Sequence, residues 1–347
     1  MPKFMKFIEF KENFNFMKKI IMLVLACFTA LGCVSFAACK TNEKGNDDKI
    51  SAACTIFPLY DWTKNIIGDR REEFELTFLV DGGVDFHSYQ PSVQDIAKIS
   101  TCDLFIYVGG ESDAWVDNAL KNATNKNMKV INLLEVLGDK VKAEETVEGM
   151  EHEHDDDNEK DHDGEHGVEE YDEHVWLSLK NAAVCCEEIA SAIKSLDEEN
   201  AESYENNLAA YKEKLTTLDK NYSTAVTNAK YKTLVFGDRF PFRYLADDYG
   251  LKYYAAFAGC SAETEASFET IIFLAGKIDE LKLSAVCTIE GANHKIAEQV
   301  KNNTTAKNQK VVTFDSMQSV TAKDVEKGVS YISIMQNNLN ALKIALN

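Results

Sequence analysis

The sequence predicts an α/β protein of two βαβ-type lobes, each with a parallel sheet, joined by one long rigid helix. Two observations support this fold class. Short apolar runs alternate with longer helical patterns in both halves of the chain, and an uninterrupted helical pattern occupies residues 201–230 between the halves. We therefore expect an N-terminal lobe over residues 50–200, a linking helix over 201–230 and a C-terminal lobe over 231–347.

Eight apolar runs are candidate strands. Most are nearly continuous rather than alternating, which is typical of parallel strands covered on both faces. The runs are residues 52–57, 75–80, 103–108 and 129–133 in the first half, and 233–237, 252–257, 284–289 and 310–314 in the second.

The linking segment has the pattern of a single amphipathic helix. It contains neither Gly nor Pro, and its large apolar residues recur at steps of three and four, which places them on one stripe. A helix of this length would be about 45 Å long, enough to run along both lobes. The stripe consists of Leu208, Tyr211, Leu215, Leu218, Tyr222 and Val226.

The N-terminus resembles a secretory signal peptide over residues 1–39, with Met17 as its natural start. Lys18 and Lys19 precede an uncharged run over residues 20–38, and the chain turns polar directly after Cys39. A transmembrane anchor is the alternative, since the run approaches the length needed to span a bilayer. Small residues at the end of the run and the polar tether over residues 40–49 favour the signal peptide.

Cys39 is the candidate lipidation site. It follows a pair of alanines in a pattern that resembles a bacterial lipobox, in which the cysteine is acylated and becomes the mature N-terminus. Cys33 is a competing site, but it would leave the apolar residues 34–36 unused. Acylation at Cys39 would hold an extracytoplasmic domain at the membrane surface.

An acidic, His-rich loop is predicted over residues 144–173. Sixteen of its residues are Asp or Glu and almost none is large and apolar, so we expect disorder. Clustered imidazoles and carboxylates favour weak, multi-site zinc binding, although a solvated tether without a role is the alternative. The loop's candidate auxiliary ligands are His152, His154, His162 and His166.

The net charge and the pattern of cysteines argue against a nucleic-acid-binding protein and against a disulfide-rich protein. The net charge of −20 argues against a nucleic-acid partner, because phosphates require Lys and Arg. The cysteines after Cys39 are scattered and lack the spacing of a zinc motif, and a disulfide framework is not expected in a chain this long. They are Cys54, Cys102, Cys185, Cys186, Cys260 and Cys287.

Two histidine motifs carry a family resemblance. Residues 84–91 read VDFHSYQP, with Phe86 where the family has Pro, and residues 172–177 read DEHVWL, with Glu173 replacing Pro. Residues 57–61, 113–116 and 243–251 extend the match. The chain resembles the solute-binding components of zinc and manganese ABC importers over nearly all of residues 50–347.

The resemblance implies a metal cleft between the lobes, with two ligands from each. His87 and His174 would come from the first lobe, and Asp238 and Asp315 from the second. Glu290 would orient a ligand, with direct ligation as an alternative. These candidates lie at or just past the ends of predicted strands, where open α/β sheets bind ligands, or at the start of a helix after a loop. Asp238 departs from the usual His or Glu, and its spacing to Tyr244 is one residue longer than the family's.

The expected function is capture of Zn²⁺ and its delivery to an ABC permease. Imidazole favours zinc, whereas carboxylates also admit Mn²⁺, so a manganese-specific protein of the same fold is one alternative. A surface adhesin is the other. No enzyme is expected, because the chain lacks a zinc-hydrolase motif, a G-x-S-x-G elbow and a P-loop.

Overall fold

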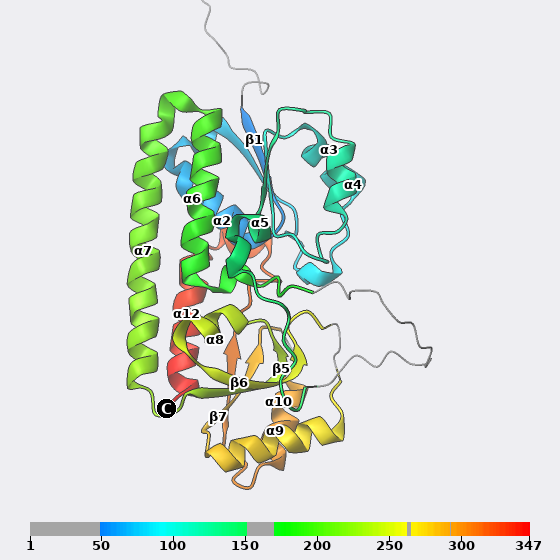
Figure 1. The fold of residues 1–347 in the computed structure, drawn as a ribbon, viewed down its shortest axis with the longest axis vertical. Coiled ribbons are helices and arrows are strands. Elements are labelled where there is room, and N and C mark those ends of the chain that lie inside the picture. The colour runs from blue at the N-terminus through cyan, green and yellow to red at the C-terminus, as the bar shows by residue number, and fades with distance from the viewer. Residues whose placement is uncertain (1–48, 151–169, 262–264, 292) are drawn as a thin grey trace, which may run out of the picture. The chain divides into compact units, whose positions relative to one another are not determined.

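The computed structural model describes residues 49–150, 170–261, 265–291 and 293–347 (Figure 1). The predicted signal peptide, the lipidation candidate Cys39 and the four histidines of the acidic loop lie outside these residues. Residues 49–347 form one compact unit. Within the described part, no helix combines the length and apolarity needed to cross a membrane.

The N-terminal sheet is parallel throughout, with strand order β2-β1-β3-β4. Helices connect successive strands, as the alternating pattern predicts. The elements are β1 (Ile50–Cys54), α2 (Phe57–Ile67), η2 (Gly68–Glu73), β2 (Phe74–Phe78), η3 (Phe86–Ser88), α3 (Val93–Thr101), β3 (Leu104–Tyr107), α4 (Val116–Lys121), β4 (Lys129–Asn132), α5 (Leu133–Leu137) and η4 (Gly138–Lys140).

The C-terminal sheet repeats this arrangement, with the parallel order β6-β5-β7-β8. Its elements are β5 (Thr233–Phe240), α8 (Arg243–Tyr249), β6 (Lys252–Ala258), α9 (Phe268–Leu281), β7 (Ala285–Ile289), α10 (Lys295–Asn303), β8 (Lys310–Phe314), α11 (Ala322–Glu326) and α12 (Tyr331–Ala345). All eight predicted strands are present, which confirms the α/β class with two lobes. The first ends earlier than expected, because Pro58 in the first turn of α2 favours a helix start at Phe57.

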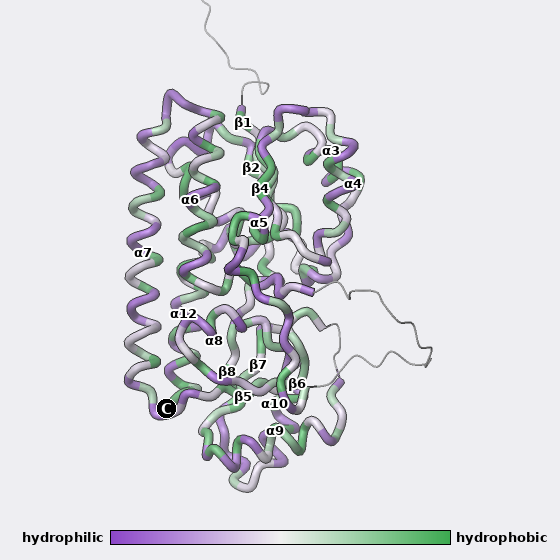
Figure 2. Tube along the Cα trace, viewed as in Figure 1, coloured by the Kyte–Doolittle hydropathy of each residue, from purple (hydrophilic) through white to green (hydrophobic). Residues whose placement is uncertain are grey.

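Between the sheets the chain forms η5 (Val175–Leu177), α6 (Leu179–Leu196), η6 (Glu198–Asn200) and α7 (Ala201–Asn228). Helix α7 is the predicted long helix, about 42 Å from end to end. Its six predicted stripe residues are all buried, together with Tyr204. In Figure 2, α7 alternates between hydrophilic and hydrophobic residues along its length, as an amphipathic helix must.

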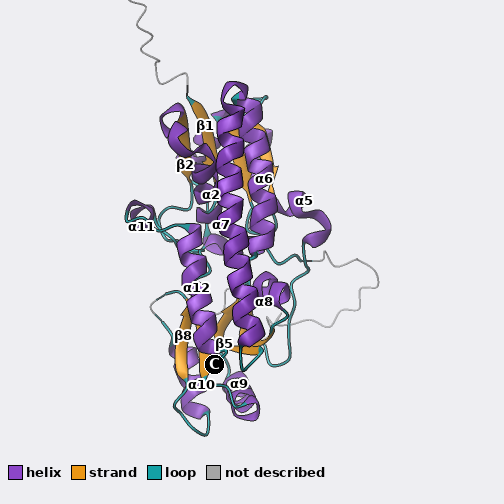
Figure 3. Cartoon of the chain, turned by 90° about the vertical axis from the view of Figure 1, so that its left-hand side faces the viewer, coloured by secondary structure: helices purple, strands orange, loops and turns teal. Residues whose placement is uncertain are grey.

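Helix α7 is bonded to both halves of the unit. Near its start, Asn207 Nδ2 donates to the carbonyl oxygen of Ile66 at the end of α2, at 3.0 Å. Near its end, the Tyr222 hydroxyl donates to the Met335 carbonyl of α12, at 2.6 Å. Figure 3 shows α7 beside α6 and α12, in front of the strands of both sheets. The helix therefore acts as a stiff brace rather than as a flexible linker.

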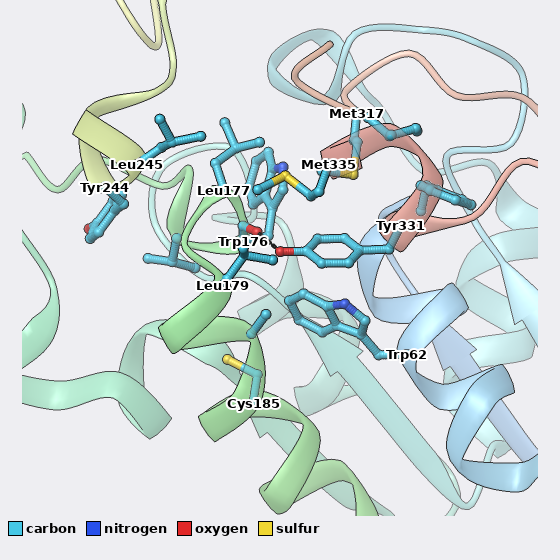
Figure 4. Packing of buried hydrophobic residues seen from close by; sticks show 14 of the residues in the cluster. Trp62, Trp176, Leu177, Leu179, Cys185, Tyr244, Leu245, Met317, Tyr331 and Met335 are labelled. Atoms are coloured by element: carbon cyan, nitrogen blue, oxygen red, sulfur yellow. Dashed lines mark hydrogen bonds between the residues drawn. The ribbon is translucent and has the colours of Figure 1, made fainter. Parts of the chain in front are cut away.

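One continuous hydrophobic core joins the lobes, because the same buried cluster includes residues of both sheets and of α2, α6, α7 and α12. Trp62, Trp176 and Tyr331 lie at its centre (Figure 4). The Tyr331 hydroxyl donates to the Trp176 carbonyl at 2.7 Å, and the Trp176 indole donates to the Ser316 carbonyl at 2.9 Å. These bonds hold η5, from the first half of the chain, against the second half.

Removing the Tyr331 hydroxyl should destabilise the protein. In Tyr331→Phe the buried Trp176 carbonyl loses its donor, which typically costs about 1–3 kcal/mol. Urea unfolding should show this loss, whereas Tyr171→Phe, at a residue that is 48% exposed, should change the unfolding free energy by less than about 0.5 kcal/mol. Equal stability of the two variants would contradict this role for the hydroxyl.

Candidate metal centre

His87 lies in η3, the short turn that follows β2. The Asp85 carboxylate caps this turn by accepting from the His87 backbone N–H at 3.1 Å. The neighbouring Phe86, which stands where the family has Pro, is buried with its ring edge-on to Trp176 at 6.0 Å. The cap and the buried ring together fix the backbone from which His87 projects.

His174 is fully buried directly before η5. One oxygen of Asp172, Oδ1, accepts both from the His174 backbone N–H and from its ring Nδ1, each at 2.9 Å. The Tyr244 hydroxyl, in α8, donates to the Asp172 carbonyl oxygen at 2.8 Å. Groups from both lobes therefore set the orientation of the His174 ring.

The two imidazoles face each other through their Nε2 atoms, which are 3.1 Å apart. His87 Nδ1 lies 2.8 Å from Ser112 Oγ and 3.5 Å from Glu173 Oε2. With each Nδ1 held by an oxygen, each Nε2 is left available for a metal, the arrangement that metal-ligating histidines usually adopt. Two Nε2 atoms on one tetrahedral zinc would lie about 3.4 Å apart, close to the spacing seen here.

Glu173 is the buried carboxylate behind His87. Burial opposes its ionisation, but hydrogen bonds from His87 and Ser112 outweigh burial and lower the pKa of Glu173. Its Oε1 accepts from the Ser112 backbone N–H at 2.9 Å. Gly110 makes room for it, because a Cβ at this positive-φ position would lie 2.3 Å from that oxygen. The replacement of the family's Pro thus supplies a charge beside a candidate ligand.

Cys260 completes the group. The ligand atoms of His87, His174 and Cys260 all lie within 4.8 Å of one another, and across the described ranges no other trio of His, Cys, Asp or Glu side chains is grouped in this way. Cys260 follows β6, so it comes from the C-terminal lobe. Burial raises the pKa of its thiol, and the nearby carboxylates of Glu144, Asp172 and Glu173 act in the same direction.

The structure places Asp238 outside this group. Strand β5 continues to Phe240, so Asp238 lies within it and not after it, at a register shift against β6. Its Oδ2 accepts from Thr288 Oγ1 at 2.7 Å and from the Ile289 N–H at 3.3 Å. The carboxylate of Asp238 is therefore hydrogen-bonded to the neighbouring strand β7.

Asp315 and Glu290 also lie outside the group of three. Asp315 follows β8, and its Oδ1 accepts from the Met317 N–H at 2.8 Å. Glu290 accepts from the backbone N–H of Ser316 at 2.7 Å and from its hydroxyl at 2.5 Å. Burial and the charge of Asp315 raise the pKa of Glu290 to about 7, and burial raises that of Asp315. Ligation by Asp238, Asp315 or Glu290 stays a prediction.

Sequence reasoning missed Cys260 and the orienting roles of Asp172 and Glu173. One signal could have found the cysteine. It lies three residues past the end of the predicted strand over 252–257, near the carboxyl edge where parallel sheets bind ligands, an argument that also supported the candidates chosen by resemblance. Two imidazoles with a thiol are donors typical of zinc sites.

Comparison with known proteins identifies a zinc-uptake family. The family described as "Zinc-uptake complex component A periplasmic" matches residues 53–345. The zinc-binding lipoprotein AdcA of Streptococcus pneumoniae is 34% identical over 331 residues, which cover 94% of this chain and 61% of that protein. The chain thus spans about three fifths of the length of this relative.

Two further relatives match along nearly their whole length. The high-affinity zinc uptake system protein ZnuA of Bacillus subtilis is 29% identical over 326 residues, which cover 94% of this chain and 97% of that protein. The crystal structure of the Zn(II)-bound ZnuA-like domain of S. pneumoniae AdcA superposes with a TM-score of 0.66 at 30% identity, covering 86% of this chain and 99% of that domain.

The buried carboxyl of Asp113 gives a testable pH dependence. It accepts from the N–H groups of Val108 and Gly109, in the turn that carries Ser112, at 2.9 and 3.1 Å. Burial, helped by the charge of Glu173, raises its pKa from 3.8 to about 7. The folded state therefore holds a proton that the unfolded chain releases, so this group's contribution to stability falls as pH rises from about 4 to about 7.

Asp113→Asn should remove this contribution, and the unfolding free energy should then vary less between pH 5 and pH 7. A tenfold difference in proton affinity between the folded and unfolded states corresponds to about 1.4 kcal/mol, so urea unfolding at the two pH values can detect the change. Asp117→Asn, at an exposed position in α4, is the control and should keep the wild-type pH dependence. An Asp113→Asn variant with that same dependence would refute the assignment.

Proposed function

Because the chain belongs to the zinc-uptake complex component A family, we propose that it captures Zn²⁺ outside the cytoplasm and delivers it to an ABC permease. One observation carries the proposal: the two opposed Nε2 atoms of His87 and His174, each on a ring whose Nδ1 is held by an oxygen. Preorganised rings avoid much of the ordering cost of binding, which supports high affinity.

The position of this pair suits capture and transfer. Both histidines lie where the N-terminal lobe meets the second half of the chain, beside the Arg239–Asp85 ion pair at 2.6 Å. The Arg239 hydrogen bond and charge outweigh burial and lower the pKa of Asp85, the cap of the His87 turn. Because a common core and α7 join the lobes, we propose that zinc enters and leaves by local movement of the surrounding loops.

Two parts of the proposal concern residues outside the described structure. Acylation of Cys39 would hold the protein at the outer face of the membrane, near a permease, with residues 40–49 as a tether. The histidines of the acidic loop would gather zinc weakly and raise its local concentration near the site. The name "zinc-binding lipoprotein" of the streptococcal relative supports the anchor.

Substitution of either central histidine tests the function. In His87→Ala or His174→Ala, zinc affinity should fall by at least about 100-fold, because even loss of an outer hydrogen-bond partner costs 10–100-fold. Titration against a competing chelator measures this. His294→Ala is the control, since His294 bonds to Thr288 Oγ1 at 3.1 Å and lies outside the group. Wild-type affinity in both central variants would refute metal capture and leave the adhesin alternative.

The loop is tested by replacing His152, His154, His162 and His166 together with Asn. We expect one tight zinc per chain to remain and additional weak binding to be lost, because imidazoles supply the nitrogen donors of the loop. Native mass spectrometry and calorimetry count the two classes of zinc. A lower stoichiometry of the tight site would show instead that the loop supplies one of its ligands.

A further inference from the structure

We propose that the Cys260 thiolate is the third protein ligand of the captured zinc, and that it makes the site select zinc over manganese. The inference rests on the proposed zinc capture and goes beyond it, because it names a ligand and a basis for selectivity. Cys260 is the one member of the group that comes from the C-terminal lobe. A zinc ion held by all three side chains would therefore bridge the lobes.

The loop after β6 is built to approach His174 closely. A Cβ on Gly259 would lie 3.0 Å from His174 Cε1 and 3.0 Å from the Phe240 carbonyl oxygen, so a larger residue would push the loop away from the ring. The Cys260 backbone N–H donates to Glu144 Oε1 at 3.0 Å, which fixes the other side of the loop. Glycine at 259 and this bond together place the sulfur beside the two imidazoles.

The competing third ligand, Asp238, lacks such a placement. Its Oδ2 already accepts from Thr288 and Ile289, and its Oδ1 accepts from the Arg239 backbone N–H at 2.9 Å. Turning it toward the histidines would break bonds that tie β5 to β7. The thiol of Cys260 needs no comparable rearrangement, since its sulfur is already within 4.8 Å of a ligand nitrogen on each ring.

The donor set explains the selectivity. Two imidazole nitrogens and one thiolate suit zinc, which binds thiolates at about 2.3 Å and accepts four-coordination with water in the last position. Manganese favours carboxylate, carbonyl and water oxygens. On binding, the Zn–S bond replaces the S–H bond, the proton passes to solvent, and coordinated waters leave the zinc ion. A thiolate therefore adds to the preference that the histidines already confer.

Spectroscopy on the unmodified protein gives the first test. With Co²⁺ as the probe, we expect a sulfur-to-cobalt charge-transfer band in the near ultraviolet, and X-ray absorption of the zinc form should show one Zn–S distance near 2.3 Å, as expected for thiolate. These measurements do not depend on the folding of a variant. A cobalt spectrum without the band and a zinc shell of nitrogen and oxygen alone would overturn the inference.

Matched variants give the second test. Cys260→Ser should lose the band and weaken zinc by at least about 100-fold, and Cys260→Asp should lower the ratio of zinc to manganese affinity by at least about tenfold. Cys102→Ser, at a buried thiol outside the group, is the matched control and should keep the band and wild-type zinc affinity. If Asp238→Asn loses affinity while Cys260→Ser keeps it, the third ligand is Asp238 and the inference is wrong.

The two proposals fail in distinguishable ways. Wild-type zinc affinity in Cys260→Ser, together with large losses in His87→Ala and His174→Ala, would refute the thiolate ligand and leave zinc capture standing. Unchanged affinity in all three variants would refute both. Circular dichroism of each metal-free variant establishes that it is folded before its affinity is compared.

Discussion

The bond between His174 and Asp172 is the interaction on which the rest of the site depends. A single carboxylate oxygen holds both the backbone and the ring of a fully buried histidine. Tyr244 holds Asp172 from the C-terminal lobe, and Gly259 lies against the ring. The ring of His174 is therefore the fixed group beside which His87 and Cys260 are placed.

The turn that carries His174 is also attached to the hydrophobic core. The turn after His174 contains Trp176, whose indole bonds to Ser316 and whose carbonyl accepts from Tyr331. The metal group is thus attached to the core shared by both lobes, and α7 braces that core along its length. Preorganisation of this kind lowers the ordering cost of binding a metal, and the same rigidity restricts the movements of the His174 ring that could release one.

Most of the fold could be predicted from the sequence because it depends on local periodicity. Most of the eight strands are nearly continuous apolar runs, and α7 follows from the stripe between Leu208 and Val226. The opposed pair of His87 and His174 was expected from motif resemblance. The proposed third ligand, Cys260, belongs to neither histidine motif, so the resemblance did not select it. Strand β5 runs through Asp238 with a shifted register, and the approach of Cys260 depends on how the loop after β6 packs on another lobe. Neither the register shift of β5 nor the packing of this loop produces a periodic pattern in the sequence.

Two departures from the family pattern, at positions 173 and 238, both concern groups around the candidate metal site. Glu173, in place of Pro, puts a buried carboxylate behind His87 and favours a ring whose Nε2 is available. At position 238 the expected third histidine is absent, and a cysteine in the next loop along the sheet edge lies beside the two remaining imidazoles. Under the proposal that the Cys260 thiolate is the third ligand, a ligand absent from β5 is replaced by one after the neighbouring strand β6. Since parallel strands bring their carboxyl ends to one edge, such an exchange keeps the metal position and changes only the donor. Sulfur in place of nitrogen would then favour zinc over manganese, because thiolates suit zinc and manganese prefers oxygen ligands.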